Sequence, residues 1–109
     1  MAKYNDAALN ELFSALSDPT RRKMVERLAR GPMTVGEMAE GFALSQPGIS
    51  KHVKVLERAG LLRREVLGRV HRCSLEPRAM DAASGWLERQ RRFWSAALDR
   101  LDAFVKKGT

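Results

Sequence analysis

Apolar side chains recur at helical spacing in the middle of the chain, at Ile49, Val53 and Leu56. Positions i, i+4 and i+7 fall on one side of an α-helix. The segment Ser45-Gln46-Pro47 before them offers a capping hydroxyl and a proline that a first helical turn tolerates, and Ala59-Gly60 is typical of a helix end. We therefore predict a helix over residues 45–60. Its other face would carry Pro47, Ser50, Lys51, Lys54 and Arg58.

Three shorter helices are predicted before this segment. The first begins near Asp6. The second begins at Asp18-Pro19, where the aspartate caps the helix and the proline takes its first position. The third begins at Thr34, which forms a capping box with Glu37, and extends as far as residue 42.

Two further elements are predicted after residue 60. Two short runs with β-branched residues flank Gly68 and predict a hairpin with a basic tip, and a long helix begins near Pro77. The predicted fold is mostly α with a small β-hairpin, in the order α-α-α-α-β-β-α. At 109 residues the chain is expected to form a single domain over residues 1–109.

Spaced motifs extend this picture over nearly the whole chain. They are Phe13-Ser14-Ala15-Leu16-Ser17-Asp18-Pro19-Thr20-Arg21-Arg22, Ser45-Gln46-Pro47-x-x-Ser50-x-His52-x-x-x-Leu56-x-x-Ala59-Gly60-Leu61, Gly68-Arg69 and Leu75-x-Pro77. Together they resemble the ArsR/SmtB family of prokaryotic repressors. The resemblance implies a winged helix-turn-helix whose helix 45–60 enters the DNA major groove and whose basic wing is the hairpin 63–72. It also implies a homodimer formed by the first and last helices.

The positive charge of the chain is concentrated where this interpretation needs it. The formal net charge is +7, and residues 45–72 hold seven Lys or Arg against two Asp or Glu. A polyanion such as double-stranded DNA explains this placement better than general solubility does, although a merely solvated basic surface is the alternative.

The candidate DNA contacts fall into three groups. Small polar side chains at the start of helix 45–60 can approach base edges, lysines on its exposed face can reach phosphates or guanine, and basic residues of the wing can meet the backbone or a minor groove. Arg21 and Arg22 oppose the dipole of their own helix, which indicates nearby phosphates unless they are ordinary surface arginines. His52 lies at the flank of the apolar stripe, so a structural role competes with a DNA contact. The full set is Ser45, Gln46, Ser50, Lys51, His52, Lys54, Arg69, His71, Arg72, Arg21 and Arg22.

The last helix carries more apolar surface than one small domain needs, including two tryptophans and two phenylalanines. In a monomer this stripe would leave an exposed apolar patch. We predict a dimer interface, with docking on the protein's own domain as the alternative. Its candidate residues are Leu9, Phe13, Trp86, Phe93, Trp94, Ala97, Leu101 and Phe104.

Metal sensing through the sites known in the resembled family is not expected. The thiolate positions of that family fall here on Thr34 and Gly36, which are not ligands for soft metals, and the last helix has no histidine. No metal and no cofactor are therefore predicted, and the sequence does not define a small-molecule inducer.

Cys73 is the only cysteine, which excludes an intrachain disulfide and suits a reducing cytoplasm. Its default role is that of a buried small apolar residue. A weaker hypothesis is an oxidisable thiol whose pKa is lowered by Arg69, His71 and Arg72.

The remaining sequence features argue against other classes of function. The N-terminus lacks the apolar core of a signal peptide, no apolar run approaches the ~20 residues of a membrane span, and no catalytic set or Gly-rich phosphate loop is present. We therefore expect a cytoplasmic, non-enzymatic regulator that binds an inverted-repeat operator as a homodimeric repressor. The alternative is a winged-helix protein-interaction module whose basic face docks an acidic protein.

Overall fold

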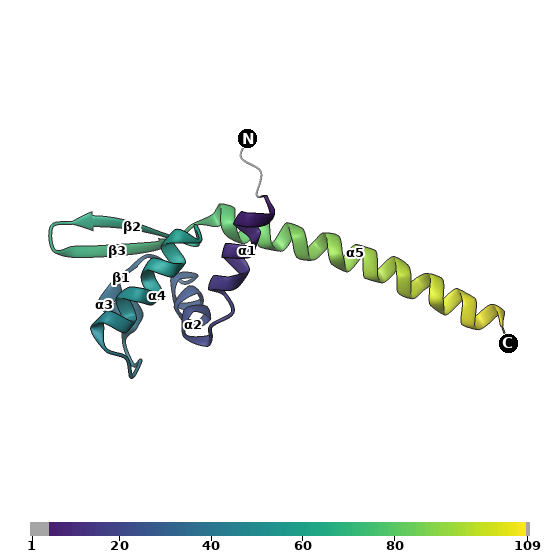
Figure 1. Ribbon diagram of the computed structural model, residues 1–109, viewed down its shortest axis with the longest axis horizontal. Helices are drawn as coiled ribbons and strands as arrows, with labels where there is room; N and C mark the ends of the chain where they lie inside the picture. The colour runs from purple at the N-terminus through teal and green to yellow at the C-terminus, as the bar shows by residue number, and fades with distance from the viewer. Residues whose placement is uncertain (1–4, 109) are drawn as a thin grey trace.

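The computed structural model describes residues 5–108, and Figure 1 shows their arrangement. The predicted order of four helices, a hairpin and a long last helix is confirmed. The elements are α1 (Asp6–Ala15), α2 (Pro19–Leu28), β1 (Met33–Thr34), α3 (Val35–Ala39), α4 (Gln46–Arg58), β2 (Leu62–Leu67), β3 (Val70–Leu75) and α5 (Pro77–Lys107).

Two details differ from the prediction. Helix α3 ends at Ala39 instead of continuing to residue 42, because Glu40 leaves the helical backbone (ψ 131°) and Gly41 adopts a positive φ of 85°. A positive φ is readily accessible only to glycine, so this residue fixes the turn towards α4. The second difference is the strand β1, whose two residues are too few to produce an alternating pattern.

The first four helices begin at capped ends. Asn5, Asp18, Thr34 and Ser45 each accept a hydrogen bond from the backbone N–H three residues later, at 2.8, 3.0, 3.1 and 3.2 Å respectively. In α3 the capping box is complete, because Glu37 also accepts the N–H of Thr34 at 2.9 Å. Each such cap satisfies a donor that the helix leaves without a partner, and is worth ~1 kcal/mol.

The three strands form one antiparallel sheet in the order β1-β3-β2. Leu62 of β2 lies opposite Leu75 of β3, and the hairpin closes at Gly68, whose φ is 64°. On the other side of β3, Met33 of β1 lies opposite Cys73. The hairpin therefore extends from a small sheet anchored beside α3, as Figure 1 shows.

A single apolar core holds these elements together. It receives side chains from every helix and from the sheet, and no polar or charged residue among those described is buried in it. Its fully buried large members are Leu12, Met24, Met38, Val53, Leu56, Leu61 and Cys73.

Helix α5 leaves this core after its first turns. Only Ala79 and Ala83 of its 31 residues are buried, and the rest of the helix projects away from the domain, opposite the hairpin (Figure 1). The radius of gyration is 18.7 Å. A compact chain of this length would have about 13 Å. Most of α5 therefore has no covering partner within its own chain.

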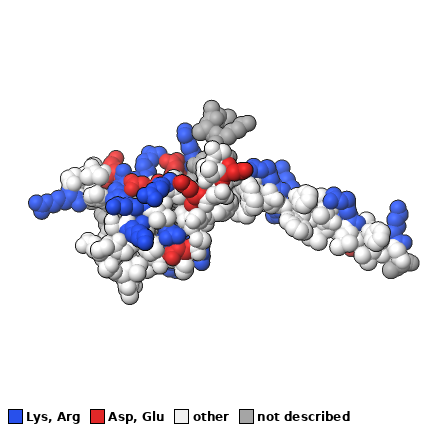
Figure 2. Space-filling model, viewed as in Figure 1, with Lys and Arg blue, Asp and Glu red and all other residues white. Residues whose placement is uncertain are grey.

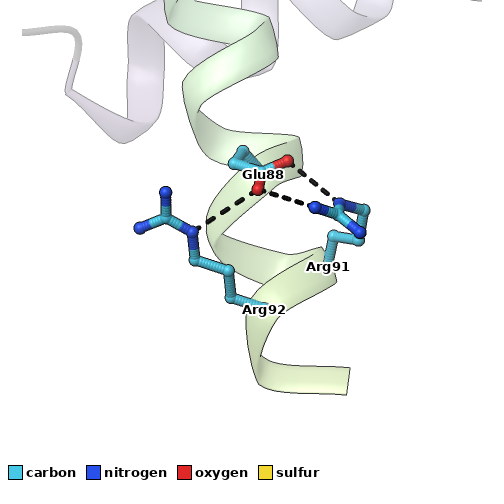
Figure 3. Close-up of polar contacts among 3 residues, drawn as sticks. All are labelled: Glu88, Arg91 and Arg92. Atoms are coloured by element: carbon cyan, nitrogen blue, oxygen red, sulfur yellow. Dashed lines mark hydrogen bonds and ion pairs between the residues drawn. The ribbon is translucent and has the colours of Figure 1, made fainter. Parts of the chain in front are cut away.

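One side of projecting α5 is polar. Glu88 binds Arg91 at 3.0 Å and Arg92 at 3.4 Å, so one carboxylate pairs with two guanidinium groups one turn further along (Figure 3). At about 100° per residue, the apolar stripe through Trp94, Leu101 and its neighbours lies on the opposite side.

Within residues 5–108, no helix has the length and hydropathy needed to span a membrane.

Candidate nucleic-acid interface

Helix α4 presents one face to the core and the other to solvent. Ile49, Val53 and Leu56 are buried, whereas Lys51 and Lys54 are exposed. The predicted division of this helix into two faces is confirmed. Because the major groove admits one α-helix, an exposed face of short polar and cationic side chains has the right dimensions and charge to enter it.

Two polar residues at the start of α4 differ in how many hydrogen-bonding groups they have available for DNA. Gln46 is exposed and has no hydrogen-bond partner among the residues described. The hydroxyl of Ser45 accepts a hydrogen bond from the N–H of Gly48 and thereby caps the helix. What this hydroxyl can still offer to DNA is chiefly the donation of its own O–H proton. Ser50, one turn further along, is half-buried.

The hairpin supplies the second positively charged element. Arg69 is exposed beside the turn at Gly68, and Figure 2 shows positive charge at the far end of the hairpin. Arg72 is also exposed, whereas His71 is half-buried. The three predicted wing residues therefore differ, and Arg69 is the one placed to reach farthest from the domain.

A groove of about 690 Å³ separates α4 from the wing. Gln46 and Ser50 of α4 and Arg69 and His71 of the wing are among its lining residues. The structure thus brings predicted contact residues from α4 and from the wing to one depression. Its remaining lining residues are Thr34, Val35, Gly36, Ala39, Leu44, Ile49, Val53, Arg64 and Val70.

Arg64 is a functional candidate that the sequence analysis missed. From β2 its guanidinium donates to Glu57 of α4 at 2.8 Å, and a second nitrogen lies 3.3 Å from Nδ1 of His71 on β3. Arg64 therefore fixes the wing to the end of α4. Because side chains alternate along a strand, the buried neighbour Leu62 already places Arg64 on the inner face.

Arg21 and Arg22 have partners within the protein. Arg21 donates to the carbonyl of Ala15 at 2.7 Å, and Arg22 donates to that of Leu16 at 2.8 Å. The end of α1 is the negative pole of that helix, so its carbonyls, without any phosphate, account for cations that oppose the dipole of α2. Arg21 also lies 3.1 Å from Nδ1 of half-buried His52. A phosphate contact by these three residues stays a prediction.

The predicted dimer residues occupy one side of α1 and α5. Phe13 of α1 is half-buried and meets Trp86 of α5 edge to face, with ring centroids 5.5 Å apart. Farther along α5, exposure is high: 61% for Phe93, 62% for Trp94 and 75% for Phe104. The remaining candidates are Leu9 and Ala97, which are half-buried, and Leu101, which is exposed.

Cys73 is fully buried in the core beneath the sheet. The expectation that nearby cations lower its pKa is wrong, because burial raises the pKa of this thiol. The positive charge that opposes this rise belongs to Arg64, not to the wing residues that the sequence indicated. The buried apolar role of Cys73 is confirmed.

Potential metal ligands are scattered in the structure. Among residues 5–108, no three His, Cys, Asp or Glu side chains come together in a group that could hold an ion. The hydroxyl of Thr34 caps α3 by accepting the N–H of Glu37. Gly36 lies in the first turn of α3 and has no side-chain atom that could bind a metal.

A helix-turn-helix with a wing and a basic exposed helix matches known proteins closely. Residues 16–65 match the model of a helix-turn-helix domain. The HTH-type transcriptional regulator Rv2034 of Mycobacterium tuberculosis is 42% identical over 86 residues, which are 79% of this chain and 78% of that protein. A solved ArsR family transcriptional regulator has a TM-score of 0.77 and 42% identity, and the match covers 81% of this chain and 97% of the other.

The chain belongs to the ArsR/SmtB family of transcriptional regulators. The transcriptional repressor SdpR of Bacillus subtilis is also similar, at 37% identity over 79 residues that cover 72% of this chain and 88% of that protein. This ArsR/SmtB protein is therefore a DNA-binding regulator of transcription, and the alternative of a protein-interaction module is not favoured.

Proposed function

We propose that this ArsR/SmtB protein is a homodimeric repressor that binds an inverted-repeat operator through α4 and the wing. The observation that carries the proposal is the division of α4, whose apolar side is buried while Lys51 and Lys54 face solvent. The similarity to a named repressor supports the direction of regulation. Because its partner is DNA, we expect it in the cytoplasm, and we assign it no enzymatic activity.

Different residues carry different parts of the recognition. The amide of Gln46 can pair with an adenine edge, and the hydroxyl of Ser50 can bond to a base or a phosphate. Lys51 and Lys54 are flexible point charges, which suits phosphates better than bidentate base contacts. Arg69 at the wing would contact the backbone or the minor groove beside the site.

The uncovered side of α5 supports the proposed dimer. Most helical stability in proteins comes from packing of an apolar face. Here that face is exposed from Leu87 to Val105. A second copy that pairs with α1 and α5 would cover it and would set two α4 helices about 34 Å apart, one turn of DNA.

The test is a set of binding isotherms on an operator found by in vitro selection and on a scrambled duplex. Lys54→Ala and Arg69→Ala should weaken binding to both duplexes about equally and reduce the dependence of affinity on salt, because they remove phosphate contacts. Gln46→Ala should instead weaken binding to the operator more than to the scrambled duplex. The matched control is Lys107→Ala, which removes an exposed charge at the far end of α5.

Two results would contradict the proposal. One is equal behaviour of all the variants on both duplexes. The other is an effect of Lys107→Ala as large as that of Lys54→Ala, which would indicate a nonspecific response to net charge.

A further inference from the structure

Arg21 connects three helices through one guanidinium group. It projects from the first turn of α2, donates through Nε to the carbonyl of Ala15 at 2.7 Å, and reaches the carbonyl of Ser14 at 3.3 Å. Its third contact is Nδ1 of His52 on α4 at 3.1 Å. A planar guanidinium holds its donors in a fixed fork, so these contacts restrain the helices relative to one another.

The chemistry of the pair defines the direction of this contact. Arginine is a donor only, so in the bond to His52 the guanidinium of Arg21 donates and Nδ1 accepts. The main chain of Arg21 is fixed as well, because its N–H donates to the carboxylate of Asp18 at 3.0 Å. The helix cap of α2 thus anchors the Arg21 end of the contact with α4.

These contacts join the two functional parts of the molecule. Helix α1 packs on α5 through Phe13 and Trp86, which belong to the proposed dimer interface. Helix α4 carries the exposed Lys51 next to His52. Among the side-chain hydrogen bonds of the described residues, those of Arg21 are the ones that run from α1 to α4.

We infer that Arg21 is a positioning residue that sets the angle of α4 against the dimer helices and thereby the separation of DNA half-sites that the protein prefers. This inference rests on the proposed function, since half-site separation has meaning only for a dimer on an inverted repeat. A dimer reads two grooves at a fixed separation, so a small rotation of each α4 changes which spacing fits. The side chain of Arg21 acts here through α1 and His52, and not by touching phosphate.

The experiment measures affinity for a series of operators whose half-sites are moved apart or together by one or two base pairs, each at several salt concentrations. The variants are Arg21→Met, which keeps much of the side-chain volume, and His52→Gln, which leaves the bonds from Arg21 to α1 in place. Lys23→Met is the control, because Lys23 is an exposed cation of the same helix that pairs with Glu26 within α2 and is not among the proposed DNA contacts.

We expect Arg21→Met to lose about tenfold in affinity at the preferred spacing, or ~1.4 kcal/mol, and to bind neighbouring spacings nearly as well as the preferred one. Its salt dependence should equal that of the unaltered protein. His52→Gln should relax the spacing preference in the same direction, and the double variant should add little, because both substitutions break the same link. Lys23→Met should retain the preference.

A different pattern would overturn the inference. If Arg21→Met lowers the slope of log affinity against log salt by about one and keeps the spacing preference, then Arg21 is a phosphate contact. If Arg21→Met does not fold, an unaltered spacing preference in folded His52→Gln would overturn the inference. Failure of the unaltered protein to bind any inverted repeat would instead overturn the proposed function itself.

Discussion

Trp94 offers the sharpest test of the apolar side of α5. Its side chain is 62% exposed in the single chain, and in the proposed dimer this surface is covered by the partner. An aromatic side chain presents about 150–250 Å², so covering this fraction at about 25 cal/mol per Å² contributes about 2–4 kcal/mol in each protomer. A twofold interface contains the residue twice.

Only part of this free energy is expected to appear as affinity, because association also orders side chains. We therefore predict that Trp94→Ala raises the dimer dissociation constant at least about 100-fold, which corresponds to ~2.7 kcal/mol. Sedimentation equilibrium over a range of protein concentrations measures this constant. The control is Ser95→Ala, because Ser95 is exposed on the polar side of the same helical turn.

The reasoning would be refuted if Trp94→Ala and Ser95→Ala dimerised alike. A single-chain species at every concentration in the unaltered protein would be equally decisive, because then nothing covers α5. Loss of helical content in Trp94→Ala at low concentration would support the account, since the projecting segment of α5 is expected to need its partner for stability.

Three further predictions concern the domain itself. Arg64→Met should lower the free energy of unfolding by about 1–2 kcal/mol, a value reduced because Glu57 is partly exposed, and it should loosen the wing, as measured by denaturant unfolding and by amide exchange along β2 and β3. Cys73 should react with a thiol reagent at pH 8 only as fast as the domain opens, because burial raises its pKa; rapid labelling of the folded protein would contradict this. The pKa of Asp18 lies below its ordinary value of 3.8 because the N–H of Arg21 donates to it, so its contribution is complete above that value and is lost as the pH falls through the lowered pKa. Urea unfolding of Asp18→Asn should therefore show a weaker loss of stability on acidification than the unaltered protein does.

Much of the fold could be predicted because its signals are local. The caps at Asp18, Thr34 and Ser45 mark helix starts by their own hydrogen bonds, and the stripe of Ile49, Val53 and Leu56 defines the buried side of α4. Such features depend on neighbours within a few positions along the chain. The family motifs then supplied the arrangement of these elements in space.

The missed features are contacts between distant segments. Strand β1 exists because Met33 pairs with Cys73 of β3, forty positions later along the chain. A run of two residues contains no pattern from which such a pairing could be predicted. The roles of Arg21 and Arg64 likewise depend on His52 and Glu57, which the fold brings to them. The sequence shows an arginine's charge but not its partners, so it left Arg21 as either a phosphate contact or an ordinary surface arginine.

The most direct test of the account is the distance between the two α4 helices of the protein on its operator. A nitroxide label at Arg58→Cys, exposed in the last turn of α4 and outside the proposed DNA contacts, reports this distance by pulsed electron paramagnetic resonance in a Cys73→Ser background. We predict a narrow distribution centred at about 34 Å, the separation of successive major grooves on one face of DNA. A distribution centred far from one helical turn, or the absence of any interaction between labels on the bound DNA, would contradict the central claim.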